Sequence, residues 1–314
     1  MFSLMSYGEV VVDFLPNNTD LSSYSPMAGG APANVAVAYA RLGGESYFSG
    51  GISTDNFGKF LRHSLEEEGV KLDYVQNIES ANTALVLVSL DSEGERSFTF
   101  YRNDTADTKY ATTQIDSINW QDIDIFHFCS NTLTSDEMHE NTIFAVENAR
   151  EQNSIISFDV NLRPQLWADL EQLPSRVEHL INHSDLIKLS KEEAVYLAEQ
   201  YKLTYQQYIE RLLSLKVKLI IVTNGADKVH LVSQTFSSYV EVPVIKAVDT
   251  TAAGDSFLAG FIYSLTQQSE FNSLQATLFD LDKIISATLF AAKCGAHTCQ
   301  QKGAFSALPR LDEV

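Results

Sequence analysis

The sequence has few cationic residues, and this scarcity limits which partners are possible. Lys and Arg number 22 against 41 Asp and Glu, which leaves a formal net charge of −19. Nucleic-acid binding depends on clustered Lys and Arg, so this balance argues against a nucleic-acid partner. The chain also lacks an apolar run long enough to span a membrane, and residues 1–12 carry no basic leader. We therefore expect neither a membrane partner nor a signal peptide.

Cysteine is also scarce. The three cysteines, Cys129, Cys294 and Cys299, cannot all pair with one another, and their apolar surroundings favour a reduced cytoplasmic location. Cys294, His297 and Cys299 lie close together in sequence, but without a fourth ligand this group is more typical of packing than of zinc binding. With 314 residues and 45% hydrophobic residues, the chain can build the large core of one folded α/β domain.

Short apolar runs alternate with polar stretches of helical periodicity along most of the chain. The apolar runs cover residues 125–128, 155–158, 186–189 and 219–223. The periodic stretches cover residues 136–152, 172–182, 191–200 and 205–215. This alternation predicts an α/β fold whose parallel sheet is covered by helices on both faces. Asn224-Gly225, followed by apolar runs at 228–232 and 239–244, predicts hairpins after the last of these strands.

Two segments interrupt the alternation. Residues 13–28 are polar and irregular, and residues 84–90 and 97–102 have the pattern of two strands joined by a turn at 91–95. Neither segment fits a strand–helix–strand unit. We therefore expect a small β lid, formed by about residues 13–28 and 82–104, over the edge of the main sheet.

Alternation within the lid predicts an association surface. Val86 and Val88 would share one face of the first lid strand, and Leu85 and Leu87 the other, so both faces are largely apolar. Two lids packed face to face would cover such a surface, which predicts a homodimer through the lid. The alternative is that both faces are buried within one chain.

Residues 248–257 have the composition of a phosphate-binding turn. A β-prone run at 239–248 precedes them, and apolar residues at helical spacing follow. Three small residues at 252–254 leave backbone N–H groups uncovered where the helix begins, and such groups attract anions. Asp255 in the first turn would place a general base beside this anion hole, which suits phosphoryl transfer to an alcohol. The alternative is a favourably charged helix start without catalysis.

Residues 28–44 form a second segment with a functional pattern. Gly29 and Gly30 allow a ligand to approach the backbone, Pro32 suits the first turn of a helix, and paired glycines at 43–44 end it. Asn34 lies in the first turn, where its amide can reach a ligand. The alternative is a close-packed, alanine-rich helix without a ligand.

The two segments resemble the signatures of the PfkB (ribokinase-like) family of carbohydrate kinases, in the version found in bacterial-type fructokinases. Further matching segments occur in the family's order at residues 8–16, 100–102, 158–164 and 303–309, so the resemblance covers essentially the whole chain. Ala252 replaces the first glycine of the C-terminal signature. The resemblance implies one domain over residues 1–314 with a ribokinase-like three-layer fold, a mostly parallel central sheet, helices on both faces and a small β lid.

The same resemblance implies an ATP-dependent sugar kinase, specifically a fructokinase that forms fructose 6-phosphate from D-fructose, with Mg²⁺ and K⁺ as cofactors. A kinase for ribose or 2-keto-3-deoxygluconate is one alternative, and a non-catalytic binding or regulatory protein of the family is another. The absence of Lys and Arg from residues 13–28 favours a neutral sugar. The chain has no G-x-G-x-x-G after a strand, no Walker lysine motif and no H-E-x-x-H, which argues against other classes of enzyme.

Position within the matching segments implies a role for individual residues. Asp255 is the implied base, and its implied anion hole is the backbone of Ala252, Ala253 and Gly254. The implied sugar ligands are Asp13, Gly30, Asn34 and Arg102. The implied ATP ligands are Asn161, Lys188, Ser190, Glu193, Thr223, Gly225 and Gly254. Glu193 is also implied to organise Mg²⁺ through water, and the implied monovalent-cation ligands are Asp249, Thr251, Thr298, Gln301 and Gly303.

Overall fold

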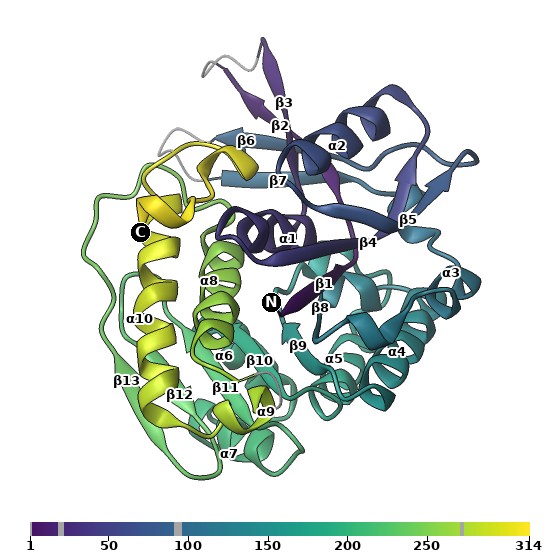
Figure 1. The fold of residues 1–314 in the computed structure, drawn as a ribbon. Coiled ribbons are helices and arrows are strands. Elements are labelled where there is room, and N and C mark those ends of the chain that lie inside the picture. Colours follow the sequence, from purple (N-terminus) through teal and green to yellow (C-terminus); the bar gives the residue numbers. More distant parts are fainter. Residues whose placement is uncertain (1, 18–21, 91–95, 271–272) are drawn as a thin grey trace.

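A nine-stranded sheet forms the centre of the molecule, which we describe from a computed structural model (Figure 1). The structure describes residues 2–17, 22–90, 96–270 and 273–314. In spatial order the strands are β13 (Ser237–Val240), β12 (Val229–Val232), β11 (Leu219–Thr223), β10 (Leu186–Ser190), β9 (Ile155–Asp159), β8 (Ile125–Cys129), β1 (Ser3–Tyr7), β4 (Glu45–Ser53) and β5 (Lys71–Ile78). All neighbours from β11 to β5 pair in parallel, whereas β11, β12 and β13 pair antiparallel.

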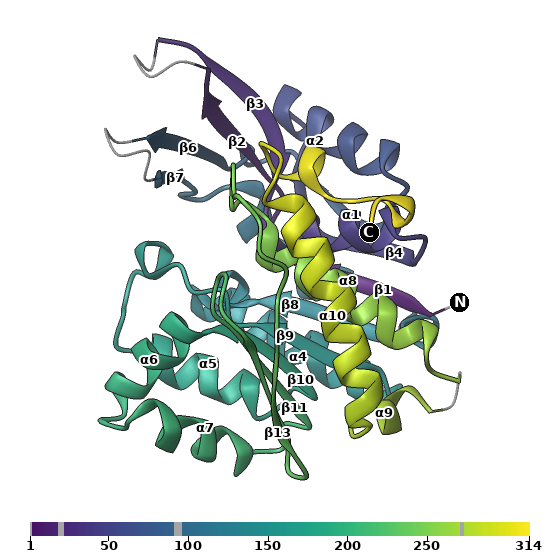
Figure 2. The same ribbon diagram turned by 90° about the vertical axis from the view of Figure 1, so that its left-hand side faces the viewer.

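Helices cover both faces of this sheet, as Figure 2 shows for α8 and α10 on one side and α5, α6 and α7 on the other. The first hydrophobic core lies under α1 (Ala31–Arg41), α2 (Asn56–Glu67), α8 (Ala253–Gln267), α9 (Leu274–Thr277) and α10 (Leu281–Thr298). The second lies under α3 (Thr112–Asp116), α4 (Asp136–Glu151), α5 (Leu173–Ile181), α6 (Lys191–Gln200) and α7 (Tyr205–Leu213). The prediction of an α/β fold with helices on both faces is confirmed.

Local sequence explains where the elements begin. Strands β8 and β9 are buried along their whole length, which accounts for their uninterrupted apolar sequence. Helix α6 begins at a capping box in which the side chains of Ser190 and Glu193 each bond the other's backbone N–H. Thr204 and Gln207 cap α7 in the same way. A polar capping residue therefore sets the start of α6 and of α7.

The β-prone run at 239–248 does not form a strand of that length. Strand β13 ends at Val240, and Val244 is 98% exposed. Pro243 has no N–H to donate to a ladder, and β13 is the edge strand of the sheet, so continued pairing has little to stabilise it. The predicted strand over residues 239–244 is therefore wrong beyond Val240, although the two hairpin connections are confirmed.

A separate four-stranded sheet, the lid sheet, stands above one end of the central sheet (Figure 2). It has the order β3 (Tyr24–Gly29), β2 (Val11–Pro16), β6 (Leu85–Leu90) and β7 (Arg96–Tyr101). Residues 13–28 were expected to be irregular, but residues 13–16 and 24–28 lie in the antiparallel strands β2 and β3. The predicted turn at 91–95 lies outside the described residues.

The two faces of the lid sheet differ in exposure. Val86 and Val88 are 3% and 2% exposed, and Val86 packs with Val11 and Phe100. This face is turned toward the cavity, which Val86 lines and where Phe98 is 40% exposed. On the opposite face Leu87 is half-buried and Tyr101 is 57% exposed.

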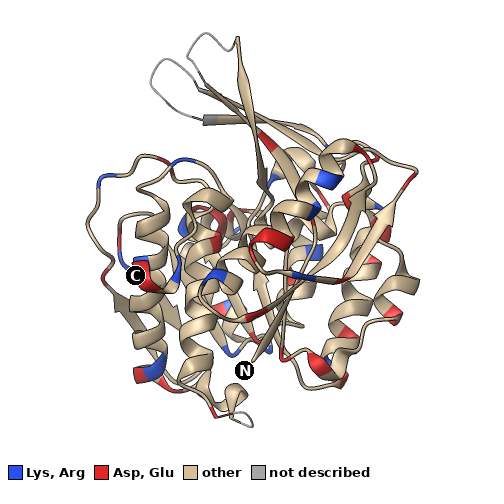
Figure 3. Ribbon diagram, turned by 45° about the horizontal axis from the view of Figure 1, so that its top comes forward, with Lys and Arg blue, Asp and Glu red and all other residues tan. Residues whose placement is uncertain are grey.

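Charge is distributed over the whole molecule. In the view of Figure 3, Lys and Arg lie among Asp and Glu on many elements and form no continuous basic stripe. Within the described ranges, no helix has the length and apolar character that crossing a membrane requires.

Candidate active site

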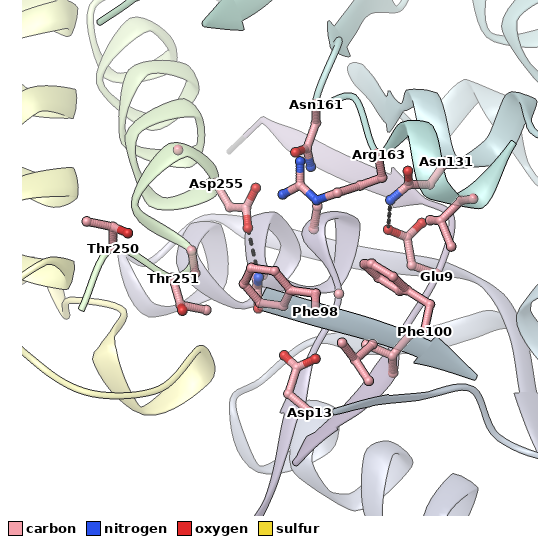
Figure 4. Close-up of a pocket in the computed structure, with 18 of the residues that line it drawn as sticks. Glu9, Asp13, Phe98, Phe100, Asn131, Asn161, Arg163, Thr250, Thr251 and Asp255 are labelled. Carbon is pink, nitrogen blue, oxygen red and sulfur yellow. Dashed lines mark hydrogen bonds between the residues drawn. The ribbon is translucent and has the colours of Figure 1, made fainter. Parts of the chain in front are cut away.

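A cavity of about 700 Å³ lies between the lid sheet and the carboxyl ends of the central parallel strands (Figure 4). This edge of a parallel sheet is where ligands bind in open α/β folds. The predicted site residues that line the cavity are Asp13, Gly30, Asn34, Arg102, Asn161, Lys188, Asp249, Thr251, Ala252, Gly254 and Asp255. The predicted site residues outside this lining are Ala253, Ser190, Glu193, Thr223, Gly225, Thr298, Gln301 and Gly303.

Asp255 lies in the first turn of α8 and is buried. Burial raises the pKa of its carboxyl group to about 6, and the charge of Asp159 adds to this effect. A hydrogen bond from Asn34 and the charges of Lys188 and Arg163 act in the opposite direction. A carboxylate with this pKa is ionised at neutral pH, yet it can hold a proton during a reaction, so it suits a general base.

The start of α8 is open to an anion. Its N-cap, Ala252, has a left-handed backbone with φ 59° and makes no side-chain hydrogen bond. A Cβ atom at Gly254 would lie 3.0 Å from Nζ of Lys188, so the lysine ammonium stands directly over the helix start. The N–H of Ala253 donates to the carbonyl oxygen of Thr250 at 3.3 Å. The other N–H groups of this turn, the helix dipole and the Lys188 ammonium converge beside Asp255.

Lys188 is held by a buried ion pair. Its Nζ lies 2.7 Å from Oδ2 of Asp159, and both side chains are at most 8% exposed. Burial disfavours the ammonium, but the charges of Asp159, Glu193 and Asp255 outweigh it and raise the pKa of Lys188. Lys188 is therefore positively charged at neutral pH.

Glycines bring α1 close to the cavity. Gly30 has φ 108°, and a Cβ atom there would lie 2.7 Å from the carbonyl oxygen of Glu9. A Cβ atom at Gly29 would lie 2.2 Å from Oδ2 of Asp13. Any larger residue would therefore displace Asp13 or the start of α1, which explains the glycine pair in the sequence.

Arg102 lines the cavity, but much of its guanidinium is already hydrogen-bonded to other residues of the chain. Nε lies 2.5 Å from Oδ2 of Asp107, and Nη1 and Nη2 donate to the carbonyl oxygen of Asn131 at 3.3 Å. The side chain of Asn131 donates to Oε1 of Glu9 at 2.8 Å (Figure 4). Burial raises the pKa of Glu9, although Arg102 and Asn131 oppose this effect. These residues form a buried polar wall on the lid side.

The predicted nucleotide residues at the ends of β10 and β11 stand together. Ser190 and Thr223 are register partners in adjacent strands, and Gly225 follows in a turn with φ 55°. Glu193, the predicted Mg²⁺ residue, uses its two carboxylate oxygens to accept hydrogen bonds from the backbone N–H groups of Leu162 and Ser190, each at 2.7 Å. Glu193 therefore joins β10 to the loop after β9.

The predicted monovalent-cation residues come from two loops that Asp249 joins. Its Oδ1 accepts from the N–H of Thr251 at 2.8 Å, and its Oδ2 accepts from the N–H of Gly303 at 2.9 Å. The backbone N–H groups of residues 248 and 249 donate to the carbonyl oxygen of Cys299. Gln301 instead pairs its side chain with His297. The loop at residues 249–251 leads directly into the start of α8.

An acidic oxygen is available for Mg²⁺ or for its bound water. Oδ1 of Asp159 is buried and has no hydrogen-bond partner in the described part of the chain. Carboxylate oxygen is the ligand type that Mg²⁺ prefers. No group of three or more His, Cys, Asp or Glu is placed to hold a metal within residues 2–17, 22–90, 96–270 and 273–314. The residues present therefore fit a Mg²⁺ ion that takes most of its ligands from water and nucleotide phosphates.

Several lining residues were not among the predicted site residues. Among them are Glu9, Phe98, Phe100, Asn131 and Arg163 in the cavity wall, and Asp159 stands behind Lys188. Arg163 lies across the cavity from Asp13 in Figure 4. Glu9, Phe100, Asp159 and Arg163 fall within matching segments, which was the available signal. Asn131 had no such signal, because only the end of β8 places it beside Glu9.

Comparison with known proteins agrees with this geometry. The model of the pfkB family of carbohydrate kinases matches residues 1–311. The chain is 34% identical to a fructokinase from Vibrio alginolyticus, with 98% of this chain and 96% of the relative covered. A fructokinase with bound ATP from Xylella fastidiosa superimposes with a TM-score of 0.94 at 38% identity, covering 99% and 96% of the two chains. A double-mutant fructokinase from Vibrio cholerae O395, bound to fructose, ADP and potassium ion, has a TM-score of 0.87 at 32% identity with the same coverage.

Proposed function

Because the chain belongs to the pfkB family of carbohydrate kinases, we propose that it transfers the γ-phosphoryl group of ATP to D-fructose and releases fructose 6-phosphate. The observation that carries this proposal is the position of Asp255, a buried carboxylate beside an open helix start and the ammonium of Lys188. The reaction needs a proton acceptor and a positive environment at the transferring group, and this arrangement supplies both.

In the proposed mechanism, Asp255 accepts the proton of the attacking hydroxyl group. The backbone N–H groups of Ala252, Ala253 and Gly254, together with Lys188, stabilise the negative charge on the transferring phosphoryl oxygens. The lid sheet bounds the cavity and limits the access of water, which would otherwise compete as the acceptor. The ends of β10 and β11, with Ser190, Thr223 and Gly225, and the nearby Asn161 contribute to ATP binding.

Fructose is the preferred acceptor in this proposal. Relatives named fructokinase match over nearly the whole chain, and one of them binds fructose together with ADP. Asp13, Asn34 and the backbone at Gly30 supply carboxylate and amide groups suited to sugar hydroxyls. Arg102 is the further sugar contact, through the N–H groups that Asp107 and Asn131 leave unused.

We also propose the cofactors and setting of the reaction. When bound, Mg²⁺ neutralises charge on the nucleotide phosphates, with Asp159 and, through water, Glu193 as the protein groups that orient it. K⁺ binds at the loops of residues 249–251 and 298–303.

The chain acts as one domain over residues 1–314 in the cytoplasm, in keeping with three cysteines that form no disulfide. Its exposed lid face forms a homodimer.

The deciding experiment is an ADP-release assay with ATP and fructose, ribose, glucose, mannose or 2-keto-3-deoxygluconate. We expect the highest kcat/KM with fructose and a product phosphorylated at the 6-hydroxyl, which NMR of the product identifies. A clear preference for another sugar would replace fructose as the substrate. Failure with all of them would favour the non-catalytic binding protein.

Asp255→Asn is the matched test of the proton acceptor. The amide has nearly the same shape but cannot take a proton, so we expect kcat to fall by about 10²- to 10⁴-fold. Nucleotide binding, measured by calorimetry, should stay close to that of the wild type. A loss of less than tenfold with unchanged KM would place the base elsewhere.

A further inference from the structure

One buried hydrogen bond joins the first helix of the chain to the proposed base. Nδ2 of Asn34, in α1, donates to Oδ2 of Asp255, in α8, at 2.7 Å, and the dashed line at Asp255 in Figure 4 marks this bond. Asn34 is 4% exposed and Asp255 is 8% exposed. The bond therefore occupies one carboxylate oxygen of Asp255 in a site sheltered from water.

The other end of the same amide has no partner. Oδ1 of Asn34 is buried and accepts no hydrogen bond from any described residue, although Asn34 lines the cavity. Buried polar atoms are almost always paired in folded proteins, so an unpaired one in a binding cavity indicates a ligand. An amide oxygen accepts hydrogen bonds, which matches the hydroxyl donors of a sugar.

We propose that Asn34 is a positioning residue that holds Asp255 through Nδ2, while its Oδ1 accepts a hydrogen bond from a sugar hydroxyl other than the one that reacts. This inference rests on the proposed function. One planar amide would then set the position of the base relative to the sugar, which goes beyond a role in sugar binding. With Oδ2 held by Asn34, Oδ1 of Asp255 is the oxygen that faces the reacting hydroxyl.

The chemical step then has a defined balance. The hydroxyl oxygen forms a bond to the γ-phosphorus of ATP, and its proton moves to Oδ1 of Asp255. The bond between the γ-phosphorus and the bridging oxygen breaks, and its electron pair leaves with ADP. Asn34 neither gains nor loses a proton, so its contribution is to the orientation and charge of Asp255.

Charged groups around Asp255 determine how the loss of Asn34 would act. The charged groups that act on Asp255 are Asp159, Lys188 and Arg163, in addition to the Asn34 amide. Asp255 in turn acts on the buried thiol of Cys129. A hydrogen bond donated to a carboxylate stabilises its charged form, so removing it raises the pKa of the acid. Since Asp159, Lys188 and Arg163 stay in place, we expect the pKa of Asp255 to rise by about one unit in Asn34→Ala.

The pH dependence of kcat tests this inference. For a base whose pKa moves from about 6 to about 7, the ionised fraction falls about fivefold at pH 6 and nearly tenfold at pH 5, but hardly changes at pH 8.5. Asn34→Ala should show this loss in kcat in addition to any pH-independent loss. The acid limb of the profile is the fall of kcat toward low pH. Asn34→Asp should move this limb further, by about two pH units, because two adjacent carboxylates resist ionising together.

Asn131→Ala is the matched control, since it also removes a buried cavity amide with an unpaired Oδ1. Its amide contacts Glu9 instead of Asp255, so we expect KM for fructose to rise while the acid limb stays where it is. An unshifted acid limb in Asn34→Ala would overturn the proposal. A shift of equal size in Asn131→Ala would overturn it as well, because the effect would then be general to the cavity.

A second measurement separates this inference from the proposed function. NMR titration of ¹³C-labelled aspartate carboxyl groups reports the pKa of Asp255 without turnover, and Asp255→Asn identifies its signal. If wild-type protein phosphorylates no sugar but this pKa rises in Asn34→Ala, the proposed function fails and the coupling stands. If fructose is phosphorylated but the pKa is the same in both proteins, the coupling fails alone.

Discussion

Backbone strain at two single residues coincides with the cavity. Ala252 has φ 59° and Asn161 has φ 36°, values that favour glycine, and both residues line the cavity. Asparagine tolerates this region better than alanine because its side chain bonds locally. The left-handed start of α8 therefore explains why glycine suits position 252 and why alanine there is strained.

Ala252→Gly should relieve this strain. We expect the free energy of unfolding to increase by up to about 1 kcal/mol, since the left-handed penalty of alanine exceeds the added chain entropy of glycine. The rate should change less than twofold, because the N–H group is retained. Urea denaturation and steady-state kinetics measure the two effects.

Ala253→Gly is the control for that substitution, because Ala253 is the first residue of α8 proper and needs no left-handed backbone. Glycine there should lower the free energy of unfolding. A lower stability for both variants would show that the methyl group of Ala252 contributes packing that outweighs its strain.

At the scale of elements, buried strands and capped helices could be predicted from sequence. The runs at 125–128 and 155–158 became β8 and β9 because burial on both faces demands apolar residues. The strand predicted from the run at 239–248 was wrong beyond Val240, because apolar content alone cannot reveal that a strand lies at the edge of a sheet. Only the position of β13 at the end of the sheet, followed by Pro243, shows why pairing stops at Val240.

The site was predictable where one segment carries both the residue and its surroundings. Asp255 and the small residues before it are contiguous, so the helix start could be recognised from sequence. The contact of Arg102 with Asn131 joins the segment after β7 to the segment after β8, and the pairing of Lys188 with Asp159 joins the adjacent strands β10 and β9. Periodicity contains no information about such distances.

The loops at residues 249–251 and 298–303 lead to a prediction about monovalent cations. Asp249 ties them together and thereby supports the start of α8. Replacing K⁺ with tetramethylammonium at equal ionic strength should lower kcat more than it changes KM for fructose, because the cation would act on the anion hole and not on the sugar. Equal kcat in the two salts would show that the loops hold their shape without a cation.

At the scale of the whole molecule, the lid sheet has one face toward the cavity and one toward solvent. The cavity face carries Asp13, Val86 and Phe100. The outer face carries Leu87 and Tyr101, of which Tyr101 is 57% exposed. A dimer that covered the outer face would bury this apolar surface without closing the cavity.

Light scattering tests the dimer. The chain has a mass of 34.9 kDa, so a dimer has twice that mass. Tyr101→Glu should give the monomer mass, because a charge would be buried without a partner at the interface. Tyr239→Glu is the control, since Tyr239 is 62% exposed but lies on β13, away from the lid sheet. A wild-type mass near 34.9 kDa would disprove the dimer.

The hydrogen bond between Asn34 and Asp255 joins residues that are 221 positions apart in the chain. During synthesis on the ribosome, the lid strands and most of the central sheet emerge long before α8. A growing chain can therefore assemble the lid wall of the cavity early, while Asp255, the proposed proton acceptor, is still missing. Under the proposed function, phosphoryl transfer becomes possible only after α8 has emerged, so products that terminate before residue 253 cannot carry it out.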